Sequence, residues 1–369
     1  MLKVRKEIVD KLYVEPGVDV VIKCLQDAVK TELMTIPPYL TALFSIEENN
    51  GKAGALVHSV VFEEMFHMTL AANTLIAIGG DVPIFKLGTS IRYPSTFPLD
   101  LDGGLVVGLA SLTKKQTHDI FMAIERPDTM AALPGEPEPL PPIGHSSHAV
   151  SLGDFYEAVI HALKELGAGI FANPRKERQI DISKWFPYKI YTCPDGPADA
   201  LLGPAESFNG KVDSFDTAKA VLMKIIEQGE GLQIKQDRIN PKDGDGGNYA
   251  HYFKFGEIYY GRTLERDPND RSGWSYSGEP VSLDSENICT VKENAALSDY
   301  QVGSGAYIAG SEFYETYCGL LRALDETFNG RPEKLNSAMG LMFQLKLVAQ
   351  QVMRFPVGDG VFAAPPFMP

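Results

Sequence analysis

The sequence has no long uninterrupted apolar run, and its N-terminus lacks the basic-then-apolar pattern of a secretory leader. A helix needs about 20 consecutive apolar residues to cross a membrane, and a leader combines a charged segment with an apolar one. We therefore expect a soluble, cytoplasmic protein with no membrane partner. With 369 residues, 44% of them hydrophobic, the chain is long enough to bury one large core or two smaller ones.

Positive charge is scarce relative to negative charge. The chain carries 34 Lys and Arg against 48 Asp and Glu, a formal net charge of −14. A surface of this sign repels phosphate backbones and anionic lipid headgroups, so nucleic acid and anionic membranes are poor candidate partners. The acidic residues are spread along the chain, which favours solubility.

Cysteines are few and far apart, and no two form a Cys-x-x-Cys pair. This excludes a zinc ribbon and a thioredoxin-type site and leaves ordinary reduced thiols as the expectation. A repeat of solenoid period is also absent. The four cysteines are Cys24, Cys193, Cys289 and Cys318.

The chemistry that is present centres on Glu64 and His67. Residues three apart share a helix face, and the apolar positions around them recur at three- and four-residue steps. A carboxylate on a core-facing stripe is unfavourable unless something pairs with it. Glu-x-x-His is the spacing used inside di-metal carboxylate bundles; the alternative is a hydrogen-bonded Glu beside a core His. The apolar positions are Val57, Val61, Met68, Ala71, Leu75 and Ile78.

The segment before this motif predicts a partner helix. Val18–Ile36 carries Glu32 on the same stripe as Leu25, Val29 and Ile36. Pro37-Pro38 predicts an interruption or kink, beyond which residues 39–46 can continue as helix. A turn at residues 47–51 then leads into a second helix at residues 53–78. Two long helices joined by a short turn form an antiparallel hairpin, in which Glu32 can face Glu64 and His67.

Two further helices supply candidate donors. Thr217–Gly229 is predicted as a helix with Glu227 and Glu230 on one face, and the flanking glycines predict that it ends or distorts there. The next helix is predicted to start near Asn248 and to direct His251 inward with Phe255 and Ile258. Asn248 occupies the position where a second Glu-x-x-His motif would carry its glutamate. This leaves open whether the site holds one metal ion or two.

The rest of the chain is predicted as long irregular segments with a few helices. Residues 81–213 are predicted to form one long insertion between two halves of a bundle. Within it we predict a helix that is capped by Thr113 and ends at Ile124, and a second helix at 154–166. We expect residues 1–264 to form the metal-binding bundle. Residues 265–369 are expected to add an irregular segment and two helices, at 311–328 and 332–355. On the last helix, Met339, Met342 and Met353 are expected to be core packing.

Together the donors predict a mainly α fold with a metal site between four helices. Its candidate ligands come from all four: Glu32, Glu64, His67, Glu227, Glu230 and His251. Hard carboxylates combined with imidazoles suit iron or manganese, and the set approaches that of di-iron bundles.

Several stretches resemble the ferritin-like proteins related to iminophenyl-pyruvate dimer synthase, an enzyme type of bis-indole pigment pathways such as those of violacein and rebeccamycin. The resemblance covers most of residues 18–262 and extends to the closing Ala-Ala-Pro-Pro-Phe367. The stretches are Thr35-Ile-Pro-Pro-Tyr-Leu-Thr-Ala-Leu43, Glu63-Glu-Met-Phe-His-Met68, Ala77-Ile-Gly-Gly80, Ile124-Glu-Arg-Pro127, Glu227-Gln-Gly-Glu-Gly231 and His251-Tyr-Phe-Lys-Phe-Gly-Glu257.

The resemblance implies a ferritin-like four-helix bundle with long irregular insertions and two additional C-terminal helices. It implies a metal site at Glu32, Glu64, His67, Glu230 and His251, with Glu227 as a further candidate. It also implies a non-haem iron oxidoreductase of secondary metabolism that acts on a small amine- or imine-bearing metabolite. The alternative is a non-catalytic ferritin-like metal-binding protein. A homo-oligomer is compatible with either.

Overall fold

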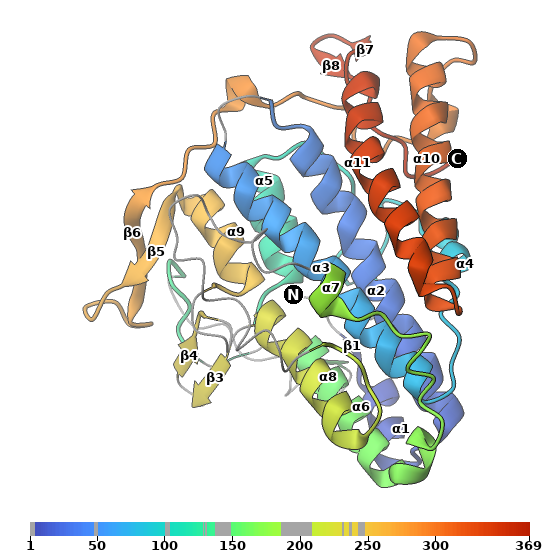
Figure 1. Cartoon of the computed structure of the whole chain (residues 1–369). Coiled ribbons are helices and arrows are strands. Elements are labelled where there is room, and N and C mark those ends of the chain that lie inside the picture. Colours follow the sequence, from blue (N-terminus) through green and yellow to red (C-terminus); the bar gives the residue numbers. More distant parts are fainter. Residues whose placement is uncertain are drawn as a thin grey trace.

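The computed structural model describes most of the chain as a helical protein (Figure 1). The described residues are 4–47, 51–99, 104–127, 129, 131–136, 149–185, 209–230, 232–235, 238–242 and 248–369. None of the described helices is both long and apolar enough to cross a membrane.

Two 27-residue helices, α2 (Val18–Phe44) and α3 (Gly51–Ala77), form the centre of the fold. They pack antiparallel along their length, as the sequence predicts (Figure 1). Nearly every residue of α3 from Val60 onward is buried, because other helices cover it on several sides.

The proline pair does not end α2, which runs through Pro37 and Pro38 without interruption. A proline lacks the N–H that would bond to the carbonyl four residues earlier. For Pro38 that carbonyl belongs to Met34, and the Tyr93 hydroxyl donates to it over 2.7 Å instead. Tyr93 thus replaces the missing backbone bond and keeps the helix continuous in the buried interior.

Two groups of helices cover the same side of the α2–α3 pair at different positions along its length. Near the turn end lie α9 (His251–Tyr260) and the segment formed by α5 (Lys114–Gln116) and the π-helix η1 (Thr117–Met122). Toward the opposite end lie α6 (Leu152–Leu166) and α8 (Phe215–Glu230), with α1 (Lys6–Val14) packed on α6. Both η1 and α6 belong to the insertion predicted at residues 81–213. This insertion therefore contributes helices to the bundle and also connects its two halves.

The C-terminal part adds a second helical hairpin, α10 (Gly305–Phe328) and α11 (Leu335–Val352). It lies along the outer side of α2 and α3, with α4 (Ile84–Ser90) against α10 (Figure 1). The final residues, 363–368, are non-helical and buried, and Phe367 packs against Phe313 and Tyr317 of α10.

The remaining elements are short. Among the described residues, four two-stranded antiparallel sheets pair β1 (Val4–Arg5) with β2 (Ala149–Val150), β3 (Leu232–Lys235) with β4 (Arg238–Asn240), β5 (Arg262–Arg266) with β6 (Trp274–Pro280), and β7 (Pro356–Gly358) with β8 (Val361–Phe362). Short helical turns are α7 (Ile182–Trp185), η3 (Ala168–Phe171), η5 (Ser285–Asn287), η6 (Leu297–Asp299) and η7 (Pro332–Lys334).

One helix boundary differs from the prediction in a way that affects the site. The helix expected to start near Asn248 begins at His251. Tyr249 pairs with Lys242 in an isolated antiparallel bridge, and Ala250 is extended, so the backbone turns helical only at His251. Asn248 therefore lies outside the helix and does not occupy the helical position of a Glu-x-x-His motif.

Candidate metal centre

Five buried side chains meet where the two groups of covering helices adjoin on α2 and α3. Glu32 comes from α2, Glu64 and His67 from α3, and His251 is the first residue of α9. Glu125 comes shortly after the helical segment that contains η1. Each is at most 9% exposed, so their charges and polar atoms are almost completely removed from water.

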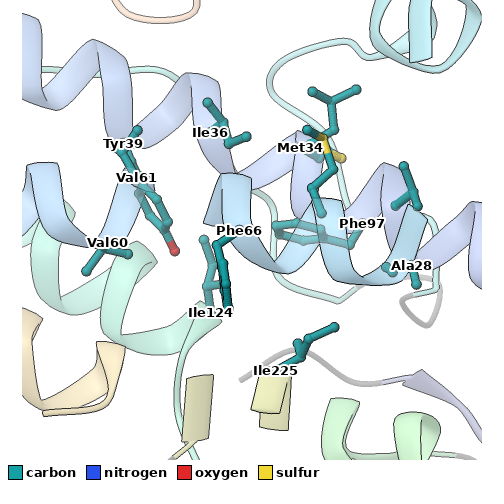
Figure 2. Packing of buried hydrophobic residues seen from close by; sticks show 14 of the residues in the cluster. Ala28, Met34, Ile36, Tyr39, Val60, Val61, Phe66, Phe97, Ile124 and Ile225 are labelled. Carbon is teal, nitrogen blue, oxygen red and sulfur yellow. The ribbon is translucent and has the colours of Figure 1, made fainter. Parts of the chain in front are cut away.

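The local sequence of η1 determines where Glu125 lies. Thr113 caps the segment by accepting a hydrogen bond from the Gln116 N–H, as predicted. Residues 117–122 then adopt π-helical geometry, which holds one extra residue per hydrogen-bonded turn and changes the register of the next residues of the chain. Figure 2 shows Tyr39 of α2 and Phe66 of α3 projecting toward Ile124. The residue after Ile124, Glu125, reaches the cluster.

Glu64, His67 and His251 form the tightest group. One ligand-type atom from each lies within 4.8 Å of the others. Nδ1 of His251 is 2.8 Å from Glu64 Oε1 and 3.4 Å from Glu125 Oε2. Nδ1 of His67 is 3.9 Å from both Glu64 Oε1 and Glu32 Oε2. Glu64 thus lies between two imidazole nitrogens, with a further carboxylate beside each.

A single observation tests whether these residues fit a metal ion. Nδ1 of His251 is completely buried and has no hydrogen-bond partner, although two carboxylate oxygens lie close to it. Its other ring nitrogen, Nε2, is 2.7 Å from Glu63 Oε2 and can donate its proton there. With the imidazole neutral and the carboxylates ionised, Nδ1 presents a lone pair toward oxygens that donate nothing. A cation among them satisfies all of these atoms at once.

His67 shows the same arrangement. Its Nε2 lies 3.0 Å from the side-chain oxygen of Gln228, which only accepts, so this nitrogen carries the proton. Nδ1 is left with a lone pair facing Glu32 and Glu64. Histidines that bind metals commonly donate their other ring N–H to a carboxylate or carbonyl oxygen, which fixes the tautomer and the ring orientation.

The carboxylates are held by partners of their own. The Tyr156 hydroxyl donates to Glu32 Oε1 over 2.5 Å. The Tyr39 hydroxyl donates to Glu125 Oε1 over 2.5 Å, and the Thr35 hydroxyl lies 2.7 Å from Glu64 Oε2. In each case one carboxylate oxygen is bonded while the other is directed toward the imidazoles.

Glu63 supports the cluster from outside. It is 4% exposed and contacts His251 Nε2, the Lys254 ammonium and the Asn248 amide. Burial raises the pKa of Glu63, but the charge of Lys254 and the contact with His251 outweigh this and lower it to about 2. Glu63 is therefore an anion that orients His251 and does not face the cluster itself.

Burial, and then repulsion among the carboxylates, shifts the pKa values of the cluster. Burial, and then the charge of Glu64, raises the pKa of Glu32 well above its usual range and also raises that of Glu125. Burial lowers the pKa of His251, but the surrounding carboxylates raise it by more. Without another cation the cluster must hold protons to remain buried, so a divalent ion that replaces them relieves this repulsion.

A small cavity of about 40 Å³ opens beside the cluster. It holds one or two water-sized groups, since one water occupies about 30 Å³ in the liquid. Glu32, Glu64, His67 and Glu125 line it together with Arg126. Arg126 is mostly buried and pairs with Glu136 at 3.0 Å.

The six ligand candidates predicted from sequence divide into three groups. Glu32, Glu64, His67 and His251 are brought together. Glu227 is half-buried on α8, about 100° from the neighbouring Gln228 that contacts His67. The side chain of Glu230 lies outside the described residues.

Glu125 was not among the predicted ligands. The prediction sought the additional carboxylate at Glu227 or Glu230, whereas the structure places Glu125 beside His251. The available signal was a carboxylate directly after the apolar residues Phe121 and Ile124, in a stretch that already carried the resemblance.

Helices arranged around a buried carboxylate–imidazole cluster are the architecture of ferritin-like bundles. A family model described as Ferritin-like matches residues 25–260, more than half of the chain, so the protein belongs to this family. Among solved structures, it is similar to a ferritin-like protein from Caulobacter vibrioides, with a TM-score of 0.54 and 20% sequence identity over 95% of this chain and 97% of that one. At this identity the likeness concerns the fold. No curated protein matches the sequence.

Proposed function

We propose that the protein is a non-haem iron oxidoreductase whose iron is held by Glu32, Glu64, His67, Glu125 and His251. The observation that carries this proposal is the unpartnered Nδ1 of His251, buried beside two carboxylate oxygens. Three carboxylates and two imidazoles are a hard, mixed oxygen–nitrogen donor set that suits iron or manganese. Bound iron would supply redox chemistry with oxygen or peroxide.

The donors divide into two sets that share Glu64. Glu32 and His67 lie on one side of it, and Glu125 and His251 on the other. This favours two ions, of which one would be held by Glu32 and His67 and the other by Glu125 and His251, with Glu64 available to both. A fourth carboxylate, usual in di-iron bundles, is absent from the described part of the cluster, so an asymmetric pair or a single ion is the alternative.

The surrounding residues have clear roles in this proposal. Gln228 and Glu63 fix the tautomers of the two histidines, while Tyr156 and Tyr39 orient Glu32 and Glu125. Apolar residues around the cavity, such as Ile124 and Ile225, exclude bulk water from it.

For the substrate we propose a small amine- or imine-bearing metabolite derived from an amino acid. Support comes from the resemblance to the iminophenyl-pyruvate dimer synthase group and from Arg126. This cation lines the small cavity, which has room for the carboxylate group of a substrate, and its guanidinium can pair with that group in addition to Glu136. The prediction is that Arg126→Met raises KM for such a substrate more than it lowers kcat.

The deciding experiment is metal analysis of protein purified without chelator, followed by oxygen-electrode measurements on the reduced protein. Iron near two ions per chain and rapid oxygen consumption, both lost in His251→Ala, are the expected results. His161→Ala is the matched control, because His161 is a partly exposed histidine of α6 whose ring contacts Tyr13 of α1 and lies outside the cluster. Bound metal without oxygen consumption would instead favour the non-catalytic metal-binding alternative. No metal under any loading condition would refute both.

A further inference from the structure

A second and much larger cavity lies on the other side of α2 and α3 from the metal centre. Its volume is about 620 Å³, and it lies between the α2–α3 pair and the α10–α11 hairpin, open to solvent on one side. Figure 1 shows these two helical hairpins running side by side. Small-molecule sites typically occupy about 300–1,000 Å³, so the volume suits one ligand.

The α2–α3 pair forms a wall shared by the two sites. Leu33 and Met65 line the large cavity, whereas Glu32 and Glu64, each one residue earlier, line the metal centre. Successive residues of a helix point about 100° apart, so the two faces of the same helices serve different sites. The large cavity is therefore separate from the small one beside the cluster.

The lining of the large cavity is mainly aliphatic, aromatic and sulfur-containing. Four methionines take part: Met65 and Met68 from α3, and Met339 and Met342 from α11. The spacing of the two α11 methionines predicts core packing, but in the structure they are only half-buried and face the cavity. Methionine is unbranched and polarisable, and surfaces rich in it adapt to flexible apolar ligands.

The charged and amide side chains of the cavity gather toward one end, whereas the hydroxyls of Thr69 and Tyr317 line it elsewhere. Glu47 comes just after α2 and His58 lies in the early turns of α3, so both are near the turn of that hairpin. Lys346 and Gln350 come from the second half of α11. Burial, and then the charge of the nearby Lys346, lowers the pKa of the His58 imidazole. No acidic side chain of the described residues forms an ion pair with Lys346.

The opposite end is apolar. It is formed by Leu324 and Phe328 at the end of α10, by Leu335 at the start of α11, and by Ile180. From Leu335 to Lys346 the helix rises by roughly 16 Å. An extended hydrocarbon advances about 1.25 Å per carbon, given C–C bonds of about 1.5 Å. The distance corresponds to a chain of about 13 carbons.

We propose that this cavity binds a long-chain carboxylate, a fatty-acid-like molecule of about 12 to 16 carbons. Its hydrocarbon lies among the methionines and aliphatic residues, and its carboxylate pairs with Lys346 at the mouth. His58 and Gln350 contribute further polar contacts. The proposal is independent of the metal centre and its chemistry.

Titration of the purified full-length protein with saturated fatty acids tests this, using calorimetry below the critical micelle concentration of each acid. The expected result is one saturable site per chain. Affinity should rise about fourfold for each added methylene and level off near the length of the cavity. No saturable binding at any chain length, or affinity independent of chain length, would overturn the proposal.

Variants locate the site. Ala55→Trp and Gly54→Leu place bulk inside the cavity, and a Cβ at Gly54 meets only an ordinary contact with Ile46. Both should weaken binding by at least tenfold. Leu347→Trp is the matched control, because Leu347 is 60% exposed and does not line the cavity. Equal weakening in all three variants, or none, would contradict the assignment.

The headgroup is tested with Lys346→Met. This variant should bind a fatty acid about tenfold more weakly than the wild type and bind its methyl ester equally well. An equal loss for acid and ester would refute the placement of the carboxylate. A second copy of the chain is the competing occupant of this face, since Phe343 at its edge is 73% exposed. A dimer that excludes the fatty acid, and that becomes monomeric in Phe343→Ser, would overturn the proposal.

Discussion

The buried pair Glu63–Lys254 allows a quantitative prediction about the support of the metal centre. Lys254 is 2% exposed, and its Nζ lies 2.7 Å from both oxygens of Glu63. At an effective dielectric constant of about 20, unit charges at this distance attract by roughly 6 kcal/mol. Desolvation offsets part of this attraction, but removing one partner leaves a buried charge and typically costs about 3–5 kcal/mol.

We therefore expect Lys254→Met to lower the free energy of unfolding by about 3–5 kcal/mol. The measurement is urea unfolding of chelator-treated protein, so that bound metal does not contribute. Combining this change with Glu63→Gln removes the stranded anion and should recover at least about 2 kcal/mol of the loss. Lys219→Met, at an exposed position of α8, is the control and should stay within about 0.5 kcal/mol of the wild type.

Two outcomes would refute this reasoning. The first is a loss below about 1 kcal/mol in Lys254→Met, which would mean that the pair is effectively solvated. The second is a double variant as unstable as Lys254→Met alone, which would assign the cost to lost packing of the lysine stem and not to an unpaired Glu63.

Three further predictions concern individual carboxylates and their partners. Glu64→Ala or His67→Ala should remove most of the bound metal. Glu63→Ala should weaken metal affinity about 10–100-fold, and this variant should still bind metal at high metal concentration. Equal loss of metal in all three variants would show that the helix faces are misassigned. Glu125→Ala should reduce the metal content from two ions per chain to one, and full loading would exclude Glu125 as a ligand. Burial raises the pKa of Glu257 to about 7, so the folded state binds this proton more tightly than the unfolded state and loses stability as pH rises from about 4.5 to 7. Glu257→Gln keeps the acceptor for the Leu264 N–H and should gain up to about 3 kcal/mol relative to the wild type between pH 5 and 8 in urea unfolding; a difference independent of pH would contradict this.

The local part of the site was predictable from the sequence. Glu64 and His67 lie three residues apart on one long helix, and Glu32 lies on a neighbouring helix joined by a short turn, so periodicity alone brings them onto facing stripes. His251 was predictable from the apolar residues that share its face. The mainly helical, ferritin-like fold is confirmed.

Other parts depend on tertiary structure that periodicity does not encode. Glu125 reaches the cluster through a π-helical register and is held by Tyr39, 86 residues away. At Pro38, the Met34 carbonyl that lacks its helical N–H partner accepts a hydrogen bond from the hydroxyl of Tyr93, 59 residues away. The methionines of α11 have the spacing of core residues, and only the separation between the two hairpins leaves them facing a cavity.

The position of the site along the chain has a consequence for biosynthesis. Glu63 and its partner His251 are 188 residues apart. At elongation rates of about 5–20 residues per second, the glutamate leaves the ribosome roughly 10–40 s before its partner. Throughout that interval the nascent α2–α3 pair carries carboxylates without the cations that later neutralise them. The first hairpin to be synthesised is thus among the last to become fully buried, and completion of the chain through α9 is a precondition for a closed site.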